Sequence, residues 1–300
     1  MEVLVVDNAA PQGAVPAAVD GLTALRVIRN PQNRGFAEAC NQGINASTGE
    51  LVLLLNDDTI LEPGALGALA DALATHTSWG ACQAKLLLMD DPSRLDSGGS
   101  FLTRSGFLVH RGLHEPETRY TEPDEIFSAK GAAFVVRRRA LATSGTFDPD
   151  FFAYFEESDL CWRLWLAGWE VGFAPGARVL HRVGATSSGL PSPFVQFHSF
   201  KNRLCTILKN AGPRQLTVMV PCHLALCLGL AGWYAARGQP GLAGAILRAI
   251  GWNVAELPRT LGKRRRIQAR RRVGDDELMP RIMRETSMRT LASYARAVRR

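Results

Sequence analysis

Short apolar runs alternate with helical segments over the first 90 residues, and this alternation limits the possible folds more than any other feature of the sequence. The clearest run is Glu50–Leu55, and similar runs occur at Val3–Val6, Leu25–Ile28 and Trp79–Ala84. Apolar runs of this length are typical of strands that are buried on both faces of a parallel sheet. The strand–helix–strand order therefore predicts an α/β fold with a mostly parallel sheet and helices on both faces.

The rest of the first 190 residues carries weaker signals of the same kind. Helices are expected at Gly35–Ala46, from Pro63 onward and at Glu156–Ala167. A hairpin is expected within Ser97–Gly112, and further strands at Phe134–Val136, Val171–Phe173 and Arg178–His181. We therefore predict one α/β domain over residues 1–193 and a helical region over residues 194–300.

The segment Leu216–Ala236 is apolar and uncharged, and it is long enough to span a membrane. Pro221 and His223 interrupt its apolar character. Three structures are compatible with this pattern: a transmembrane helix, an in-plane or re-entrant helical hairpin, and the core helix of a soluble domain.

The net charge of +7 is concentrated at the C-terminal end of the chain. Lys263–Arg300 holds 13 basic and 4 acidic residues, whereas the remaining chain holds 22 basic and 24 acidic residues. The runs Lys263–Arg266 and Arg270–Arg272 favour an anionic membrane surface as a partner, at about 1 kcal/mol per basic residue near the surface. A solvated basic face is the alternative. We expect no nucleic-acid partner, because neither an aromatic-rich nor a helix-turn-helix context accompanies these runs.

Six cysteines are scattered along the chain without a Cys-x-x-Cys pair. This spacing favours reduced, mostly buried thiols over a disulfide framework or a cysteine metal site. Because Met1 and Glu2 lead directly into an apolar run, we also expect no signal peptide. Both observations predict a cytoplasmic protein.

Three polar residues, Asn56, Asp57 and Asp58, directly follow the clearest predicted strand. An open α/β sheet places its ligand site at the carboxyl ends of its strands. Oxygen ligands at that place suit Mg²⁺ or Mn²⁺ shared with a substrate diphosphate. The alternative is an Asx turn that leads into the helix after Pro63.

A second acidic group, Glu156, Glu157 and Asp159, lies at the start of a predicted helix, where negative charge is common for structural reasons. The aromatic run Phe151–Phe155 precedes it. Aromatic rings could hold a sugar and desolvate one carboxylate, which would raise its pKa toward the range of a general base. His181 follows a short predicted strand and is a further candidate, although a single histidine is more often structural than a ligand.

Four motifs, in this order within residues 3–187, resemble the inverting family 2 glycosyltransferases with a GT-A (Rossmann-like) fold. The resemblance is strongest to their rhamnosyltransferase-like branch. The motifs are Val5-Val6-Asp7-Asn8, Asn33-Arg34-Gly35-Phe36-Ala37 with Asn41-Gln42-Gly43, Leu55–Thr59 and the run Phe147–Arg163. Each motif alone is weak evidence for this family, but the four motifs in this order are specific to it.

The resemblance implies roles for single residues. Asp58 and His181 would be metal ligands for Mg²⁺ or Mn²⁺, and Glu157 would be the catalytic base, with Glu156 as the other carboxylate of the pair. Asp159 would bind or orient the acceptor, or hold the loop. The donor would be bound by Asp7, Asn33, Gly35, Asn41, Asn56, Asp57 and Gly131, the last of which belongs to the loop Lys130-Gly131-Ala132.

The resemblance also implies a reaction and its partners. A single in-line displacement would move a sugar, with rhamnose as the expected example, from a nucleotide-diphosphate donor to a hydroxyl group. The acceptor would be a polyprenyl-linked or cell-envelope glycan. The enzyme would work at the cytoplasmic face of the inner membrane, where residues 194–300 would associate with the membrane.

Two departures from the family pattern keep an alternative open. The family usually has Glu-Asp where this chain has Glu156-Glu157, and the added methylene moves a base by about 1 Å, which can be costly. Family members also begin with a further strand and helix, so the domain is expected to be truncated or its start misassigned. The alternative is a catalytically impaired relative that binds a glycan or a partner enzyme. A nucleotidyltransferase is disfavoured, because no Gly-rich triphosphate loop with a following basic residue occurs.

Overall fold

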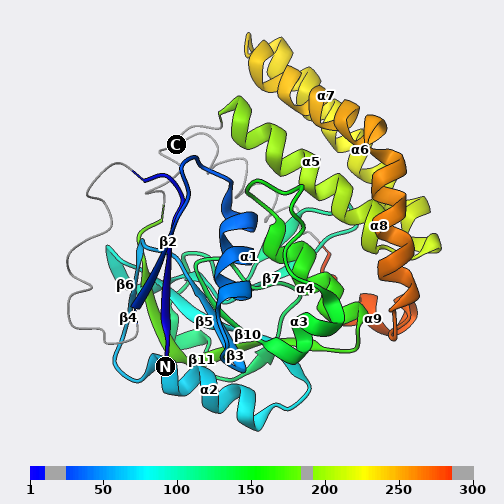
Figure 1. The fold of residues 1–300 in the computed structure, drawn as a ribbon. Helices are drawn as coiled ribbons and strands as arrows, with labels where there is room; N and C mark the ends of the chain where they lie inside the picture. The colour runs from blue at the N-terminus through cyan, green and yellow to red at the C-terminus, as the bar shows by residue number, and fades with distance from the viewer. Residues whose placement is uncertain (11–24, 184–191, 286–300) are drawn as a thin grey trace.

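The computed structural model describes residues 1–10, 25–183 and 192–285, and its main feature is a seven-stranded sheet with helices on both faces (Figure 1). Two strands extend the central path of this sheet: β6 (Asp91–Ser97) pairs with β5, and β9 (Asp124–Glu125) pairs with β11. The path itself has the spatial order β3 (Leu51–Leu55), β10 (Ala133–Arg137), β5 (Trp79–Leu88), β11 (Glu170–His181) and β4 (Thr59–Leu61). The predicted α/β class is confirmed.

The sheet is mixed in direction, so the prediction of a mostly parallel sheet is wrong although the α/β class holds. β5 and β11 are parallel, whereas β10 is antiparallel to both of its neighbours, β3 and β5. The two strands predicted at Val171–Phe173 and Arg178–His181 are one strand, β11, with a register shift against β5 between Ala174 and Arg178. Pro175 lies within this shift, where the two strands do not form a regular ladder. Its lack of an N–H group therefore removes no ladder hydrogen bond.

The first two strands, β1 (Val3–Asp7) and β2 (Leu25–Arg29), form a separate parallel pair. Across residues 1–10, 25–183 and 192–285, neither strand pairs with the large sheet, and β3 pairs only with β10. Leu51 and Leu55 of β3 are correspondingly exposed. The additional first strand implied by the family resemblance stays a prediction.

Burial on both faces explains why the central strands are apolar at successive positions. Val52 and Leu54 face a cluster that includes α1 (Phe36–Ala46), α3 (Arg138–Ser144) and α4 (Glu156–Leu166). Leu53 lies between them in the sequence and packs with the opposite cluster, to which α2 (Ala65–Thr75) contributes Leu69 and Leu73. A small hairpin, β7 (Ser100–Leu102) and β8 (Leu108–His110), lies within the range predicted for one. A short 3₁₀ helix, η2 (Glu117–Arg119), follows it.

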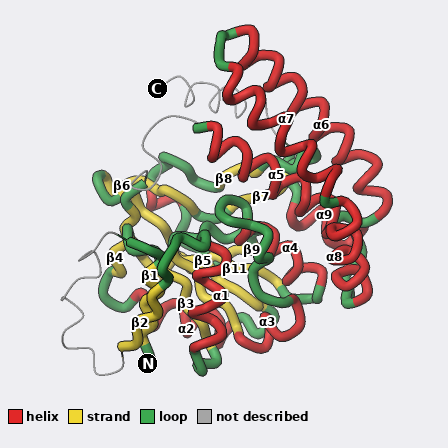
Figure 2. Tube along the Cα trace, turned by 45° about the horizontal axis from the view of Figure 1, so that its top comes forward, coloured by secondary structure: helices red, strands yellow, loops and turns green. Residues whose placement is uncertain are grey.

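The C-terminal region is helical, as predicted, and wraps along one side of the α/β part (Figures 1 and 2). Leu278 and Ile282 of the last helix and Ile207 of the first belong to the same core as α4 and the sheet. The helical region therefore shares its core with the α/β part. The first of these helices begins at residue 193, next to the predicted boundary. The helices are α5 (Pro193–Asn210), α6 (Pro213–Ala236), α7 (Pro240–Ala255), α8 (Leu257–Ala269) and α9 (Asp275–Ile282).

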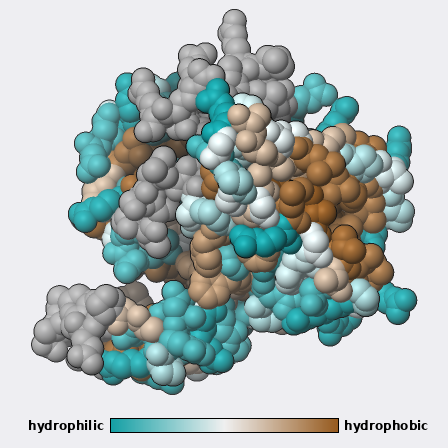
Figure 3. Space-filling view, turned by 90° about the horizontal axis from the view of Figure 1, so that it is seen from above, coloured by the Kyte–Doolittle hydropathy of each residue, from teal (hydrophilic) through white to brown (hydrophobic). Residues whose placement is uncertain are grey.

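Helix α6 contains the long apolar segment and buries only a narrow stripe of it. Only 22% of its most apolar window is buried, and α6 is the one helix in the described part of the chain that is long and apolar enough to cross a membrane. His223 in the buried stripe contacts the Ser105 carbonyl oxygen through Nδ1 at 2.8 Å. Apolar residues gather on the side of α6 and α7 (Figure 3), and the exposed ones include Leu226, Leu228, Trp233 and Leu247. This exposure argues against the core-helix alternative.

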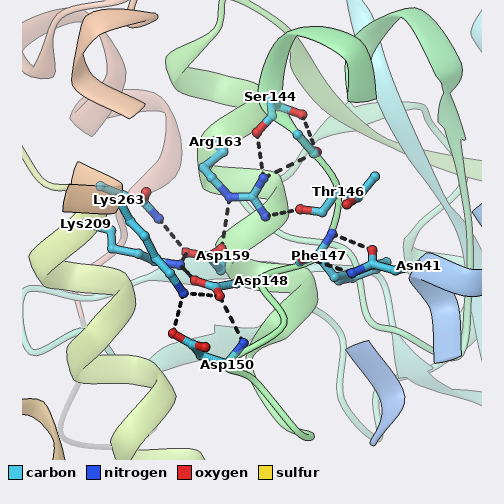
Figure 4. Close-up of polar contacts among 12 residues, drawn as sticks. Asn41, Ser144, Thr146, Phe147, Asp148, Asp150, Asp159, Arg163, Lys209 and Lys263 are labelled. Carbon is cyan, nitrogen blue, oxygen red and sulfur yellow. Dashed lines mark hydrogen bonds and ion pairs between the residues drawn. The ribbon is translucent and has the colours of Figure 1, made fainter. Parts of the chain in front are cut away.

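A buried ion-pair network joins α4 to α5 and α8 (Figure 4). Asp159 of α4 accepts a hydrogen bond from Arg163 Nε at 2.9 Å and lies 3.0 Å from Lys209 Nζ of α5. Asp148, in the loop before α4, pairs with Lys209 and with Lys263 of α8. Although burial by itself raises the pKa of an aspartate, the charges of Lys209 and Lys263 hold the pKa of Asp148 below its ordinary value.

The basic runs of the C-terminal region divide into structural and free side chains. Lys263 belongs to the network, Arg264 donates to the carbonyl oxygens of Leu208 and Ala211, and Arg271 pairs with Asp275. These three cations have partners within the chain and are not free for a partner molecule. Arg265, Arg266, Arg270 and Arg272 remain exposed. The part of the basic tail beyond residue 285 lies outside the described residues.

The network predicts a strong dependence of stability on Lys209. Lys209→Met leaves the carboxylates of Asp148 and Asp159 without a shared buried cation, so we expect the free energy of unfolding to fall by about 3–5 kcal/mol. The matched control is Arg214→Met, whose pair with Asp276 at 3.7 Å is solvent-exposed and should be worth at most about 1 kcal/mol. Urea unfolding of both variants measures the difference, and equal losses would contradict the role of the network.

Candidate active site

Strand β4 brings two predicted metal ligands together from distant parts of the sequence. It pairs antiparallel with the end of β11, and Thr59 lies opposite His181. Asp58 directly precedes β4 and therefore lies beside His181, with Asp58 Oδ1 3.5 Å from His181 Nε2. The backbone supports this placement, because Arg182 N donates to the Asp58 carbonyl oxygen at 2.9 Å.

The facing atoms of Asp58 and His181 fit a divalent cation. Asp58 Oδ1 is buried and has no hydrogen-bond donor among the described residues. His181 Nδ1 lies 2.8 Å from the carboxylate of Asp96, which can only accept, so the ring carries a proton on Nδ1. When Nδ1 carries the only ring proton, the Nε2 lone pair faces Asp58 Oδ1 at 3.5 Å. In that form the two atoms are facing acceptors, an arrangement that a cation satisfies.

The described residues supply an incomplete coordination sphere. The residues that the structure describes contain no cluster of three or more histidine, cysteine, aspartate or glutamate side chains placed to bind one metal ion. Divalent ions in phosphate-handling sites commonly take one or two protein ligands and complete their sphere with substrate phosphates and water. The Asp58–His181 pair therefore fits an ion that is shared with a bound substrate.

Asn56 and Asp57 form the turn that presents Asp58. Asn56 N donates to the Ala132 carbonyl oxygen at 2.9 Å, and the Asn56 carbonyl oxygen accepts from Thr59 Oγ1 at 2.6 Å. Asp57 is exposed. The segment is thus a turn, as the alternative interpretation predicts, but it leads into β4 before the helix α2 begins.

Glu156 and Glu157 begin α4, where Glu156 is buried and Glu157 is half-buried. Each has one carboxylate oxygen, Oε2, that is buried without a hydrogen-bond partner in the described chain. Burial raises the pKa of Glu157, and burial together with the charge of Glu157 raises the pKa of Glu156 well above its ordinary value. This is the direction that the preceding aromatic run predicts. A carboxylate with a raised pKa and an unpartnered oxygen is suited to accept a proton.

The loop Lys130–Ala132 connects the two acidic groups. Lys130 Nζ lies 2.7 Å from both carboxylate oxygens of Asp96, and its charge also acts on Glu157. A Cβ added at Gly131 would lie 3.8 Å from Glu157 Oε1. Contacts and charges therefore link Asp58, through His181, Asp96 and this loop, to Glu157, which makes the two acidic groups one site.

The aromatic run before Glu156 is held in an uncommon conformation by α5. Tyr154 and Phe155 both have a φ of 71°, in the left-handed region that side chains other than glycine rarely adopt. Asn202 of α5 donates through Nδ2 to the carbonyl oxygens of Ala153 at 2.9 Å and Tyr154 at 2.6 Å. Asn202 was not among the predicted site residues, because a single asparagine in a helix carries no signal in the sequence.

The predicted nucleotide-side residues are brought together by Asn8. Its Nδ2 donates to Asn33 Oδ1 at 3.0 Å and to the Gly35 carbonyl oxygen at 3.1 Å, and its Oδ1 accepts from Arg34 N at 2.9 Å. Asp7 lies beside it at the end of β1, which puts Asp7, Asn33 and Gly35 at one place.

Gly35 connects this group to the aromatic run. Phe36 N donates to the Phe152 carbonyl oxygen at 2.6 Å. Gly35 has a φ of 86°, and a Cβ at this position would lie 2.4 Å from the same oxygen. Only glycine fits this close approach without a shift of the backbone.

Two predicted site residues have structural contacts instead. The Asn41 side chain bonds both the N–H and the carbonyl oxygen of Phe147 at 3.0 Å, which argues against a donor-binding role. Asp159 is completely buried, and both of its carboxylate oxygens are engaged by Arg163, Lys209 and Asn210. Of the two roles expected for Asp159, these contacts favour holding the loop over contact with the acceptor.

The comparisons with known proteins agree on one family. Residues 3–195 match the family model described as glycosyltransferase like family 2. The chain is 30% identical over 222 residues to N-acetylglucosaminyl-diphospho-decaprenol L-rhamnosyltransferase of Mycobacterium tuberculosis, which covers 66% of this chain and 72% of that protein.

Two solved structures show a similar fold at low sequence identity. GalNAc-T7 with UDP, GalNAc and Mn²⁺ superposes with a TM-score of 0.55 at 17% identity, over 69% of this chain and 41% of that chain. Residues 1–349 of S. aureus TarS in complex with UDP-GlcNAc superpose with a TM-score of 0.52 at 16% identity, over 83% of this chain and 72% of that chain. At these identities the likeness concerns the fold alone.

The raised pKa of Glu156 predicts a stability change with a definite pH dependence. Its folded-state pKa lies above the unfolded value, so ionisation destabilises the fold as pH rises above the ordinary value of 4.5. Glu156→Gln removes that charge, and we expect it to raise the free energy of unfolding at pH 8 by about 1 kcal/mol or more, with little gain at pH 4. Denaturant unfolding at both pH values tests this.

The control for this measurement is Glu277→Gln, which changes an exposed glutamate in α9. It should shift stability by less than about 0.5 kcal/mol at either pH. A Glu156→Gln variant that is destabilised more at pH 8 than at pH 4 would contradict the sign derived above.

Proposed function

This chain belongs to the family 2 glycosyltransferases, is of the rhamnosyltransferase-like type and has the GT-A fold, and we propose that it transfers rhamnose to a lipid-linked glycan. The donor is a nucleotide-diphosphate sugar, and the acceptor is a hydroxyl group of the glycan. The observation that carries this proposal is the chain of contacts from Asp58 to Glu157. It joins a cation-binding pair to a carboxylate with a raised pKa, and glycosyl transfer from a diphosphate needs both.

Asp58 and His181 are the residues that would hold Mg²⁺ or Mn²⁺. When bound, such an ion neutralises charge that develops on the leaving diphosphate. The use of such an ion is supported by the GalNAc-T7 structure, which has a similar fold and is solved with UDP and Mn²⁺. Asn56 and Asp57 precede Asp58 in its turn, and Asn56 N bonds the carbonyl oxygen of Ala132, the residue after Gly131. Asn56, Asp57 and Gly131 would border the donor. Asp7, Asn33 and Gly35 would lie along its nucleotide, and Asn8 holds these three together.

Glu157 is the better candidate for the catalytic base. It is partly exposed, whereas Glu156 is 5% exposed, so an acceptor can approach Glu157 more easily. The Glu157 carboxylate would take the proton of the acceptor hydroxyl. The acceptor oxygen would then bond to the anomeric carbon as the bond from that carbon to the diphosphate oxygen breaks. One displacement of this kind inverts the anomeric configuration.

The exposed apolar face of α6 and α7 would place the enzyme at the cytoplasmic face of the inner membrane. Arg265, Arg266 and Arg270 follow this face on or just after α8 and are exposed. An apolar face combined with free cations is the pairing of signals that gives stable attachment to an anionic surface. The Mycobacterium relative supports such a location, because its name specifies a decaprenol-linked acceptor.

The catalytic assignment predicts the behaviour of two variants. Asp58→Ala removes a cation ligand, and Glu157→Gln removes the base while keeping its size. We expect each to lower kcat by about 100-fold or more, the usual contribution of a positioned acid or base. Rhamnosyl transfer from a nucleotide-diphosphate donor in the presence of Mn²⁺ provides the measurement.

Asp71→Ala is the control for the activity assay, because Asp71 is an exposed aspartate on α2. It should leave kcat unchanged. Full turnover by both Asp58→Ala and Glu157→Gln would exclude the proposed mechanism. A wild-type protein that binds the donor and metal but shows no transfer to any acceptor would favour the impaired, binding-only alternative.

The membrane assignment predicts a loss of vesicle binding in the double variant Leu228→Gln/Trp233→Gln. These side chains are 56% and 41% exposed on α6, and removal of their apolar surface should weaken binding to phosphatidylglycerol-containing vesicles by about 10-fold or more. Leu66→Gln on α2, 40% exposed and on another side of the molecule, is the control. Flotation of the full chain with vesicles measures binding by the wild type and both variants. Equal binding by the wild type, the double variant and the control would exclude this surface as the membrane-binding site.

A further inference from the structure

We propose that Asp96 is a positioning residue that holds the His181 imidazole with its Nε2 lone pair toward Asp58, and so raises the affinity of this pair for a divalent cation. The inference rests on the proposed function, which assigns the cation to Asp58 and His181. Asp96 lies in β6 and belongs to none of the four motifs of the sequence. Its side-chain contacts in the described structure are with His181 and Lys130, so the role proposed for it is positioning and not catalysis.

The carboxylate of Asp96 is placed to select one form of the ring. Asp96 Oδ2 lies 2.8 Å from His181 Nδ1, and the Asp96 side chain is 1% exposed, so water does not compete for this contact. An ionised carboxylate only accepts hydrogen bonds, which requires the proton on Nδ1. The opposite nitrogen, Nε2, then has a free lone pair and lies 3.5 Å from Asp58 Oδ1.

Several segments hold the Asp96 carboxylate in place. Lys130 Nζ contacts both of its oxygens at 2.7 Å. The backbone N–H of Lys130 donates to Gln83 Oε1 at 2.6 Å, and Gln83 Nε2 donates to the Ser97 carbonyl oxygen at 3.1 Å. Gln83 of β5 thus ties the loop that carries Lys130 to the residue after Asp96. The orientation of His181 is therefore fixed from outside the Asp58 turn.

This arrangement matters for cation affinity because a histidine binds metal only through a nitrogen without a proton. Without Asp96, nothing in the described structure holds the proton on Nδ1. Carboxylates that orient metal-binding histidines in this way typically change metal affinity by 10- to 100-fold when they are removed. A purely structural Asp96–Lys130 ion pair would have no such effect on the ring.

The first experiment reads the ring itself in metal-free protein. Long-range ¹H–¹⁵N NMR of histidine-labelled full chain distinguishes a proton on Nδ1 from one on Nε2, and His181→Gln assigns the signal. We expect the Nδ1–H form in the wild type and a shift toward the Nε2–H form in Asp96→Ala. Asp96→Asn keeps an acceptor oxygen and should retain the Nδ1–H form. A wild-type ring protonated on Nε2 would overturn the proposal.

The second experiment measures binding of Mn²⁺ alone, from the electron paramagnetic resonance signal of free Mn²⁺. We expect Asp96→Ala to weaken binding by about 10- to 100-fold, and Asp96→Asn to weaken it by less than about 10-fold. The matched control is Glu117→Ala. Glu117 also pairs with two cations, Lys85 at 2.8 Å and Arg178 at 2.9 Å, but has no contact with His181.

The outcomes separate this inference from the proposed function. If Asp96→Ala and Glu117→Ala bind Mn²⁺ equally well and the histidine signal is unchanged, the role of Asp96 is overturned. The proposed function is not affected by that result. A wild-type protein that binds no Mn²⁺, even with a nucleoside diphosphate present, would overturn the metal assignment in the proposed function. If Asp96→Ala does not fold, Lys130→Gln provides the same two readings at smaller amplitude, because it removes the cation that holds the Asp96 carboxylate.

Discussion

The buried ion-pair network around Asp148, Asp159 and Lys209 is the constraint on which the rest of the structure depends. It places buried charges where α4, α5 and the loop before α4 meet, and such charges are tolerated only when each has its partner. The two catalytic candidates, Glu156 and Glu157, begin α4. Their position is therefore set by a helix that the C-terminal region holds in place.

The helical region thus has two roles, one on each of its sides. Toward the α/β part, Asn202 of α5 holds the carbonyl oxygens of the strained aromatic loop, and Lys209 of the same helix completes the ion-pair network. Away from it, α6 and α7 present exposed apolar side chains. An exposed apolar surface and a support for the aromatic loop are therefore parts of the same helical unit, which under the proposed function would keep a membrane-bound acceptor close to Glu157.

The sequence predicted the order of the elements well, because apolar periodicity reports burial directly. It misjudged features that depend on pairing between distant segments. β11 was expected as two strands, since Pro175 and Gly176 interrupt the apolar pattern, but the ladder with β5 continues beyond them. Asn41 was expected at the donor, although its amide is used by Phe147.

The sequence by itself determined the α/β class, the apolar C-terminal helix and the presence of two acidic groups, because each of these follows from local order and composition. The family followed from the resemblance of four ordered motifs. Only the tertiary structure decided how the groups combine. The register of β4 against β11 puts His181 beside Asp58, and the buried contacts of Asp96 and Lys130 join that pair to Glu157. These contacts link residues far apart in the chain, and their geometry depends on which distant strands pair and on which side chains the pairing buries.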